Sequence, residues 1–109
     1  MMTLSKLRTV ISEISTFQNK VAYRAFPVGE APALPFVCYL DTVTNNFYAD
    51  NKVYAVIQNE DVELYTATKS ETTEAALETA LNDNGLVWEK SEVYLEDENC
   101  YEIIYTLTL

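Results

Sequence analysis

The most informative absence in this chain is histidine, which occurs nowhere among its 109 residues. The chain therefore lacks the commonest general base and the commonest transition-metal ligand. Only two cysteines and two glycines are present. Two separated cysteines cannot build the usual structural zinc site, and two glycines cannot form a P-loop or a dinucleotide-binding loop. These absences predict a protein with no cofactor, no metal site and no enzymatic activity, which acts through contacts with other molecules.

Basic residues are also scarce, since seven lysines and arginines stand against seventeen acids, for a formal net charge of −10. Nucleic acid and anionic membranes repel such a chain overall. The charge is uneven, because four bases and one acid occur up to Gly29, whereas three bases and sixteen acids follow it. Either the folded domain has a basic flank and an acidic body, or the acids simply decorate a solvated surface.

Long apolar runs are missing as well. No segment approaches the roughly 18 apolar residues that span a bilayer, and Ser5, Lys6 and Arg8 interrupt the segment where a signal peptide would have its apolar core. Cys38 and Cys100 are far apart, and both lie in apolar, strand-like runs. We therefore expect a protein made in the cytoplasm, with no membrane partner and with two buried, reduced thiols.

The N-terminal segment has the periodicity of a helix. Leu4, Leu7, Ile11 and Ile14 form one apolar stripe, which predicts a helix of about four turns that begins after an N-cap at Thr3. A second helix is predicted from a capping-box match, Thr68 to Glu71, as far as about Asp83 and a stop at Asn84-Gly85. Its inner face is expected to carry Ala76, Leu77, Ala80 and Leu81, and its outer face Glu71, Glu74 and Glu78.

The remaining segments favour strands. Strands are expected at residues 21–26, at 36–40 with a continuation toward 48, and at 53–57, 62–66, 86–95 and 100–109. Asn59-Glu60-Asp61 is expected to break the strand before it, and Glu96-Asp97-Glu98 to form a solvated hairpin tip. The order α-β-β-β-β-α-β-β predicts a single α+β domain, residues 1–109, with two helices packed on one face of a mainly antiparallel sheet.

Eight tyrosines are the richest positive signal. Tyr39, Tyr101 and Tyr105 lie within apolar runs and are expected in or near the core. Others flank turns or alternate with acids, where tyrosine is suited to an interface because its ring is apolar and its hydroxyl can stay wet. These tyrosines either meet a partner or cover sheet surface without one. The candidate interface residues are Phe47, Tyr48, Tyr54, Tyr65, Lys6 and Arg8.

Several stretches resemble a known family. The sequence NFYADNKVY at 46–54, followed by VELYT at 62–66 and LVWEK at 86–90, is similar in order and spacing to tail terminator (tail completion) proteins. These are head–tail joining proteins of siphophages and prophages of Gram-positive bacteria. The resemblance also includes the opening helix, the proline-rich loop and the Glu-rich second helix. It therefore covers most of the chain, through structural motifs.

The resemblance implies a structural protein at the head–tail junction of a virion, made in the bacterial cytoplasm. It implies a homo-oligomeric ring, commonly a hexamer, that caps the tail tube and meets the head connector while DNA passes through its lumen. An adjacent head-completion (neck) protein with a similar fold is an alternative within this class. A different class stays open too: a small acidic inhibitor, or DNA mimic, that binds a basic nucleic-acid-binding partner.

Overall fold

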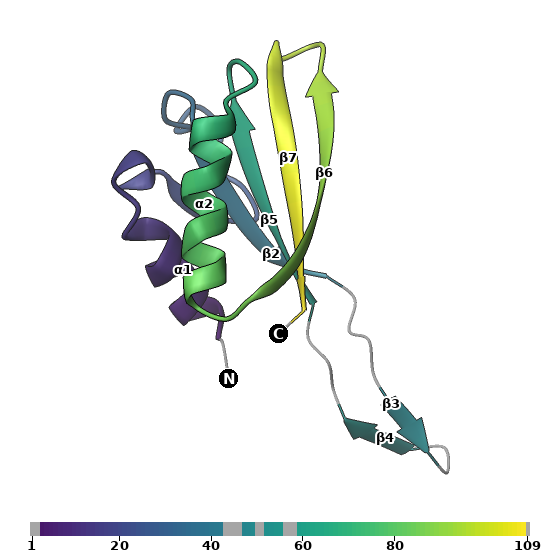
Figure 1. Ribbon diagram of the computed structural model, residues 1–109. Coiled ribbons are helices and arrows are strands. Elements are labelled where there is room, and N and C mark those ends of the chain that lie inside the picture. The colour runs from purple at the N-terminus through teal and green to yellow at the C-terminus, as the bar shows by residue number, and fades with distance from the viewer. Residues whose placement is uncertain (1–2, 43–46, 50–51, 56–58, 109) are drawn as a thin grey trace.

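The computed structural model describes residues 3–42, 47–49, 52–55 and 59–108 (Figure 1). Within these residues, two α-helices, one 3-10 helix and seven strands follow one another along the chain. The predicted α+β class and the predicted order of elements are confirmed. The elements are α1 (Leu4–Ser12), the 3-10 helix η1 (Ser15–Phe17), β1 (Val21–Tyr23), β2 (Phe36–Asp41), β3 (Phe47–Ala49), β4 (Lys52–Ala55), β5 (Asn59–Thr66), α2 (Glu71–Asp83), β6 (Val87–Leu95) and β7 (Cys100–Thr108).

The main sheet has five strands in the order β1-β2-β5-β7-β6. β1 runs parallel to β2, and every other neighbouring pair in this sheet is antiparallel. The sheet is therefore mainly antiparallel, as predicted, but the single parallel pair makes it mixed. Parallel neighbours need a crossover connection, and residues 24–35, which include all three prolines, supply it here.

Both helices cover one face of the main sheet (Figure 1). Because side chains alternate along a strand, every second side chain of each strand faces the helices. The apolar ones among them pack in one core with helix residues Leu7, Ile11, Leu77 and Leu81. The predicted alternation of the last strand is confirmed from residue 103 onward, where Ile103, Tyr105 and Leu107 are buried and Thr106 and Thr108 are exposed. The contributions of β5 and β7 to this core are Val62, Leu64, Ile103, Tyr105 and Leu107.

Helix α1 begins as predicted but ends early. The Thr3 hydroxyl accepts a hydrogen bond from the Lys6 backbone N–H at 3.1 Å, so Thr3 is the N-cap. The predicted four turns are wrong, because the helix ends at Ser12 after nine residues. The backbone then extends and forms η1, which buries Phe17 completely. If α1 continued to residue 17, η1 would not form. We interpret η1 as the turn that directs Phe17 into the core.

Helix α2 shows a different N-cap from the predicted one. Ser70, and not Thr68, accepts from the backbone N–H of Thr73 at 3.3 Å. The predicted stop is confirmed, since Gly85 has a φ of +70° and the next residue, Leu86, donates its N–H to the Leu81 carbonyl at 3.0 Å. This is the Schellman arrangement, in which a left-handed residue after the helix lets the chain reverse.

Strands β3 and β4 form a separate antiparallel ribbon, inserted in sequence between β2 and β5. Figure 1 shows the ribbon beyond one end of the main sheet. The strand predicted to continue from residue 36 toward residue 48 is thus divided into β2 and β3. The break predicted at residues 59–61 is wrong, because these residues begin β5 and pair with β7. Cross-strand pairing overrides their local turn preference.

Strand ends also differ modestly from the sequence expectations. β1 stops at Tyr23, since Arg24 has a φ of +66°. The ends of the strands predicted at residues 53–57 and 100–109 lie outside the described residues. The acidic segment at residues 96–98 forms the turn between β6 and β7, as predicted. Neither described α-helix is both long and apolar enough to traverse a lipid bilayer.

Candidate interaction surface

The face of the main sheet turned away from the helices is the candidate interaction surface. We call it the open face, and it is centred on Phe36, Tyr65, Glu63 and Glu102. Register places Phe36, Tyr65 and Glu102 side by side on β2, β5 and β7. Because side chains alternate along strands, this row projects opposite to the buried core row. The open face therefore combines aromatic and acidic groups over the central strands.

Tyr65 organises this surface. Its ring centroid lies 5.0 Å from that of Phe36. Its single hydroxyl proton is shared between Glu102 Oε2, 2.8 Å from the hydroxyl oxygen, and Glu63 Oε1, 3.3 Å from it, and both carboxylates accept. Burial, followed by the hydrogen bond to Glu102, raises the pKa of the Tyr65 phenol, so the hydroxyl stays protonated. One half-buried tyrosine thus ties an aromatic pair to two carboxylates.

The carboxylates make the open face acidic. Register places Glu63 in the row next to that of Glu102, with Asp61 and Glu89 in the row beyond it, so four acids come from three adjacent strands. Burial, followed by repulsion from Glu102, raises the pKa of the Glu63 carboxyl. A cationic group placed beside these acids would relieve that repulsion.

Two hollows flank the aromatic pair. One, of about 340 Å³, lies between Phe36 and Tyr65 on one side and Leu95 and Cys100 on the other. The second, of about 210 Å³, lies toward the crossover segment and is lined by Phe26 and Arg24 as well as by the aromatic pair. Hollows of this size accept individual side chains of a partner. Glu98 is the charged residue that lines the larger hollow, whereas Arg24 is the one that lines the smaller.

The two cysteines lie in this part of the fold without forming a bond to each other. Both are free and buried, so the predicted reduced and buried thiols are confirmed. Burial, with smaller contributions from Glu63 and Glu102, raises the pKa of the Cys38 thiol to about 11. Burial likewise raises the pKa of the Cys100 thiol. A protonated, buried thiol is a poor nucleophile, so neither cysteine has the properties of a reactive site.

The three predicted interface residues whose side chains are described do not come together. Lys6 and Arg8 are exposed on α1, on the helix-covered side of the sheet. The Arg8 guanidinium makes a long hydrogen bond of 3.5 Å to the Val21 carbonyl, which links α1 to β1. Tyr65 lies on the opposite side, in the open face, and is half-buried. The other three belong to the ribbon, and their side chains lie outside the described part of the chain: Phe47, Tyr48 and Tyr54.

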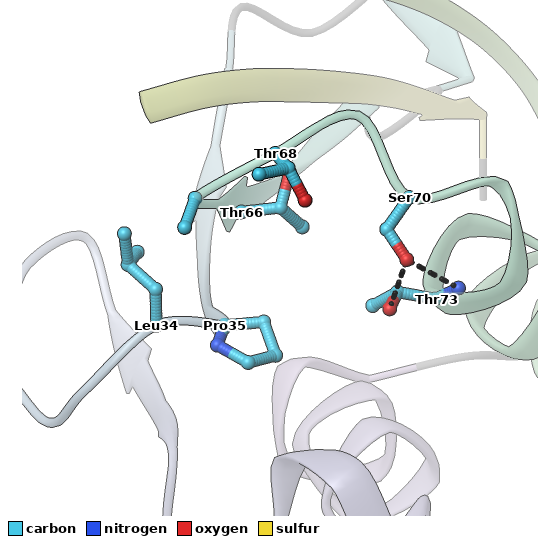
Figure 2. A pocket seen from close by; sticks show the side chains of 7 residues that line it. Leu34, Pro35, Thr66, Thr68, Ser70 and Thr73 are labelled. Carbon is cyan, nitrogen blue, oxygen red and sulfur yellow. Dashed lines mark hydrogen bonds between the residues drawn. The ribbon is translucent and has the colours of Figure 1, made fainter. Parts of the chain in front are cut away.

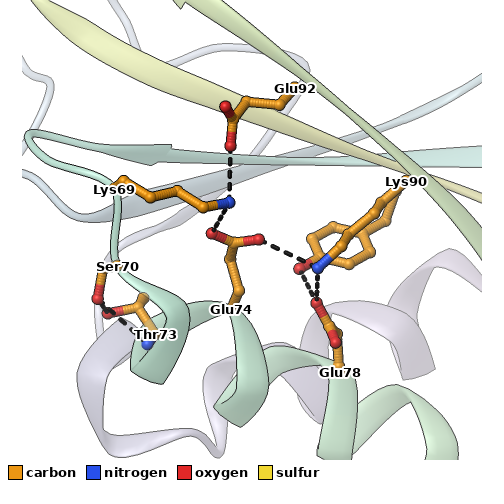
Figure 3. Close-up of polar contacts among 8 residues, drawn as sticks. Lys69, Ser70, Thr73, Glu74, Glu78, Lys90 and Glu92 are labelled. Carbon is orange, nitrogen blue, oxygen red and sulfur yellow. Dashed lines mark hydrogen bonds and ion pairs between the residues drawn. The ribbon is translucent and has the colours of Figure 1, made fainter.

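A network of charges joins α2 to β6 (Figure 3). The Glu74 carboxylate, with 4% of its side chain exposed, lies 2.7 Å from the Lys69 ammonium and 3.1 Å from that of Lys90. Lys90 also pairs with Glu78 at 2.6 Å, and Glu78 accepts from the Tyr105 hydroxyl at 2.7 Å. The prediction that Glu74 and Glu78 line an outer helix face is therefore wrong. Glu71 alone of that predicted set is exposed.

The network is electrostatically balanced within itself. Burial acts to raise the pKa of the Glu74 carboxyl, but the hydrogen bonds from Lys69 and Lys90 outweigh it and lower that pKa. The same pairings raise the pKa of both lysines, through Glu74 for Lys69 and chiefly through Glu78 for Lys90. Every charge in the network has an opposite partner, so we interpret it as a structural brace between helix and sheet.

A small hollow near the start of α2 is lined mainly by hydroxyls (Figure 2). It encloses about 180 Å³ beside the Leu34-Pro35 segment. The Ser70 and Thr73 hydroxyls are 2.7 Å apart and are occupied by capping the helix. The Thr66 hydroxyl is buried and has no hydrogen-bond partner in the described part of the molecule. None of the described residues that line this hollow is charged, and one ordered water would satisfy the Thr66 hydroxyl.

Sequence reasoning missed a pair of carboxyl groups at the end of the sheet. Asp41 of β2 and Glu60 of β5 are cross-strand partners, and Glu60 is only 1% exposed. Burial, then the hydrogen bond and the charge of Asp41, raises the pKa of Glu60 to about 8. Glu60 follows the binary pattern of β5, in which every second residue is buried. That alternation, extended backward from Val62, is the sequence signal that would have located it.

Among the described residues, no group of three or more histidine, cysteine, aspartate or glutamate side chains is arranged to hold a metal ion. The open face combines an aromatic pair, four carboxylates and two adjoining hollows, and it is the candidate site on those grounds. Comparison of the sequence with protein-family models gives no match, and comparison with curated proteins gives none either.

Proposed function

We propose that this chain is a structural protein of the phage head–tail junction, of the tail terminator type, which caps the tail tube and joins it to the head connector. One observation carries the proposal: two surfaces of opposite charge lie on opposite sides of the sheet. Lys6 and Arg8 are exposed on α1, and the acids around Glu63 and Glu102 lie on the open face. A closed ring needs two different patches of one subunit that fit each other, and these patches are complementary.

Other features support the same proposal. The resemblance of residues 46–54, 62–66 and 86–90 to tail terminator proteins supplies the class of assembly. The net charge of −10 suits a ring through which DNA slides, because an acidic protein does not retain phosphate groups. The tail-tube and head-connector proteins are the proposed partners, and the virion neck is the proposed location.

The test uses the full chain together with the tail-tube protein of a Gram-positive siphophage. Negative-stain electron microscopy would show capped tubes of limited length if the chain ends their growth. The double variant Lys6→Glu/Arg8→Glu should abolish ring formation and capping, because it places acids against the open face of the neighbour. Lys20→Glu is the matched control, since it reverses a charge in the same N-terminal part of the chain but outside α1.

Melting curves of all three proteins separate lost assembly from lost folding. The proposed contact is supported if ring formation and capping are weakened only in the α1 double variant. Added salt should reduce the difference between this variant and the wild type, because it screens the charges involved. If the wild-type chain neither caps tubes nor forms rings in their presence, the proposal is wrong.

A second candidate function is favoured by the same four carboxylates. Acids on adjacent strands of one open surface present closely spaced negative charges, as a small inhibitor or DNA mimic does to a basic nucleic-acid-binding protein. Affinity capture from host lysate distinguishes the two. Salt-sensitive recovery of a basic nuclease or another DNA-binding protein favours the inhibitor, whereas recovery of tail or connector proteins favours the junction.

A further inference from the structure

Strand β6 is an exposed edge of the main sheet. It is last in the strand order, so its inner side pairs with β7 and its outer side pairs with no described strand. It spans nine residues, whereas β1 at the other edge spans three. Val87, Val93 and Tyr94 of this strand are 70%, 43% and 48% exposed. A long edge with exposed apolar side chains offers its free backbone groups to another strand.

The sequence of β6 is complementary to itself when read in reverse. We infer that β6 pairs antiparallel with β6 of a second copy of this chain, around a two-fold axis at Ser91. In that register Lys90 faces Glu92 of the second copy, and Trp88 faces Tyr94, each pair occurring twice. The remaining facing pairs are Val87 with Leu95 and Glu89 with Val93. Opposite charges and aromatic pairs directly across a ladder stabilise it.

The charges select this register over its neighbours. A two-fold axis between antiparallel strands must pass where one residue faces its own copy. Moving the axis by one residue places it at Lys90 or at Glu92, and like charges then face each other directly. Only the axis at Ser91 places an uncharged residue opposite itself and satisfies both neighbouring charges. Mismatched registers are thus disfavoured by repulsion, which is how specificity is obtained between similar alternatives.

In this pairing, side chains that face the helices in one copy meet side chains that face the helices in the other. Lys90 and Glu92 both project toward the helix side of the sheet, where Lys90 meets Glu78 of α2 and Glu92 meets Lys69, two residues before α2 (Figure 3). Their pairing across the axis would extend the same network into the second copy. The five-stranded sheets would then join into one continuous sheet, with the helices of both copies on the same side.

This inference is independent of the proposed function. A two-fold contact closes at two copies, whereas the ring proposed above uses the heterologous contact between α1 and the open face. Contact between two strand edges buries little surface, so we expect a dimer that dissociates on dilution. The dimer is tested with the isolated chain and the ring with the tail-tube protein, so either can fail without the other.

Sedimentation velocity of the full chain over a dilution series should show a monomer of 12.4 kDa in equilibrium with a species of twice that mass. Val93 is exposed and faces Glu89 of the second copy, which makes it the sharpest position for substitution. Val93→Glu should raise the dissociation constant about twofold to thirtyfold, and Val93→Lys should lower it over a similar range. Because Val93 also neighbours Glu102 within the chain, melting curves are recorded for both variants.

The register is tested by cysteine substitution. Ser91→Cys places two thiols on the axis and should form a disulfide-linked dimer on mild oxidation. Glu89→Cys is the matched control, since position 89 faces position 93 and not itself, and it should cross-link much more slowly. A chain that stays monomeric at every concentration, equal affinities for the two Val93 variants, or equal cross-linking at positions 89 and 91 would overturn the inference.

Discussion

Glu60 provides the most quantitative test of the fold. Its carboxyl group is buried at the end of the sheet, between Asp41 of β2 and Leu107 of β7. Its Oε2 atom has no hydrogen-bond partner among the described residues. Burial is the largest cause that raises its pKa from 4.5 to about 8, and Asp41 and Asp61 add to it. Glu60 is therefore protonated in the folded protein at neutral pH.

The direction of the pH dependence follows from proton binding. Between about pH 4.5 and about pH 8 the folded chain holds a proton on Glu60 that the unfolded chain has released. The unfolded state binds fewer protons in this window, so stability falls as pH rises. The stabilising contribution is complete below about pH 4.5 and is lost once pH has risen through about 8.

The size of the effect follows from the same pKa. One pKa unit corresponds to about 1.4 kcal/mol, which sets a ceiling of roughly 5 kcal/mol for Glu60. The strand end can open to admit water, so we expect about 1 to 3 kcal/mol. Glu60→Gln keeps the shape of the side chain and donates an N–H to Asp41 but does not titrate. The variant should match the wild type near pH 5 and exceed its stability by that amount near pH 8.5.

Urea unfolding between pH 5 and pH 9, followed by the fluorescence of Trp88, the single tryptophan, measures the difference. Glu96→Gln is the control, because it removes one negative charge from an exposed turn of this acidic chain. It should shift stability only slightly, and with little pH dependence. If the wild type and Glu60→Gln give parallel curves, water reaches Glu60 in the folded state and the reasoning about its burial is refuted.

Three further predictions concern other parts of the chain. Glu74→Gln should lower the free energy of unfolding by about 1 to 3 kcal/mol, because it weakens the pairing of two lysines with a buried carboxylate. Glu71→Gln, at an exposed position in the same first turn, should change it by less than about 0.5 kcal/mol, and urea unfolding at pH 7 compares the two variants. Gly85→Ala should cost about 1 to 2 kcal/mol through its φ of +70° alone, since an added Cβ meets nothing within 4 Å; a melting temperature as high as that of the wild type would contradict this. Cys38 and Cys100 should react with a thiol reagent only after denaturant is added, and rapid absorbance change in the native protein would show that one of them is accessible.

Local patterns in the sequence were sufficient for much of the architecture. The 3.6-residue apolar stripe of α1 as far as Ile11, the alternation of β7 and the Asn84-Gly85 stop each depend on neighbouring residues, and each is found where predicted. Boundaries were less predictable. The early end of α1 depends on where Phe17 packs, and that is a property of the core and not of the segment.

The placement of charges could not be read from the sequence. Glu74 looks like a surface residue of a Glu-rich helix, and Glu60 looks like part of a turn. Their burial depends on partners 16 and 19 residues away along the chain, Lys90 and Asp41. The candidate interface residues illustrate the same limit, because the fold separates Lys6 and Arg8 from Tyr65 by the full thickness of the sheet and helix layer.

What the sequence determined by itself was the class of fold, the absence of histidine chemistry and the uneven distribution of charge. These depend on composition and on short-range periodicity, which a linear chain already contains. Only the tertiary structure decided which acids are buried, which aromatic rings meet on the open face, and that β6 is the exposed edge. Such features arise when strands distant in sequence become neighbours, and burial and pairing energies exist only after that happens.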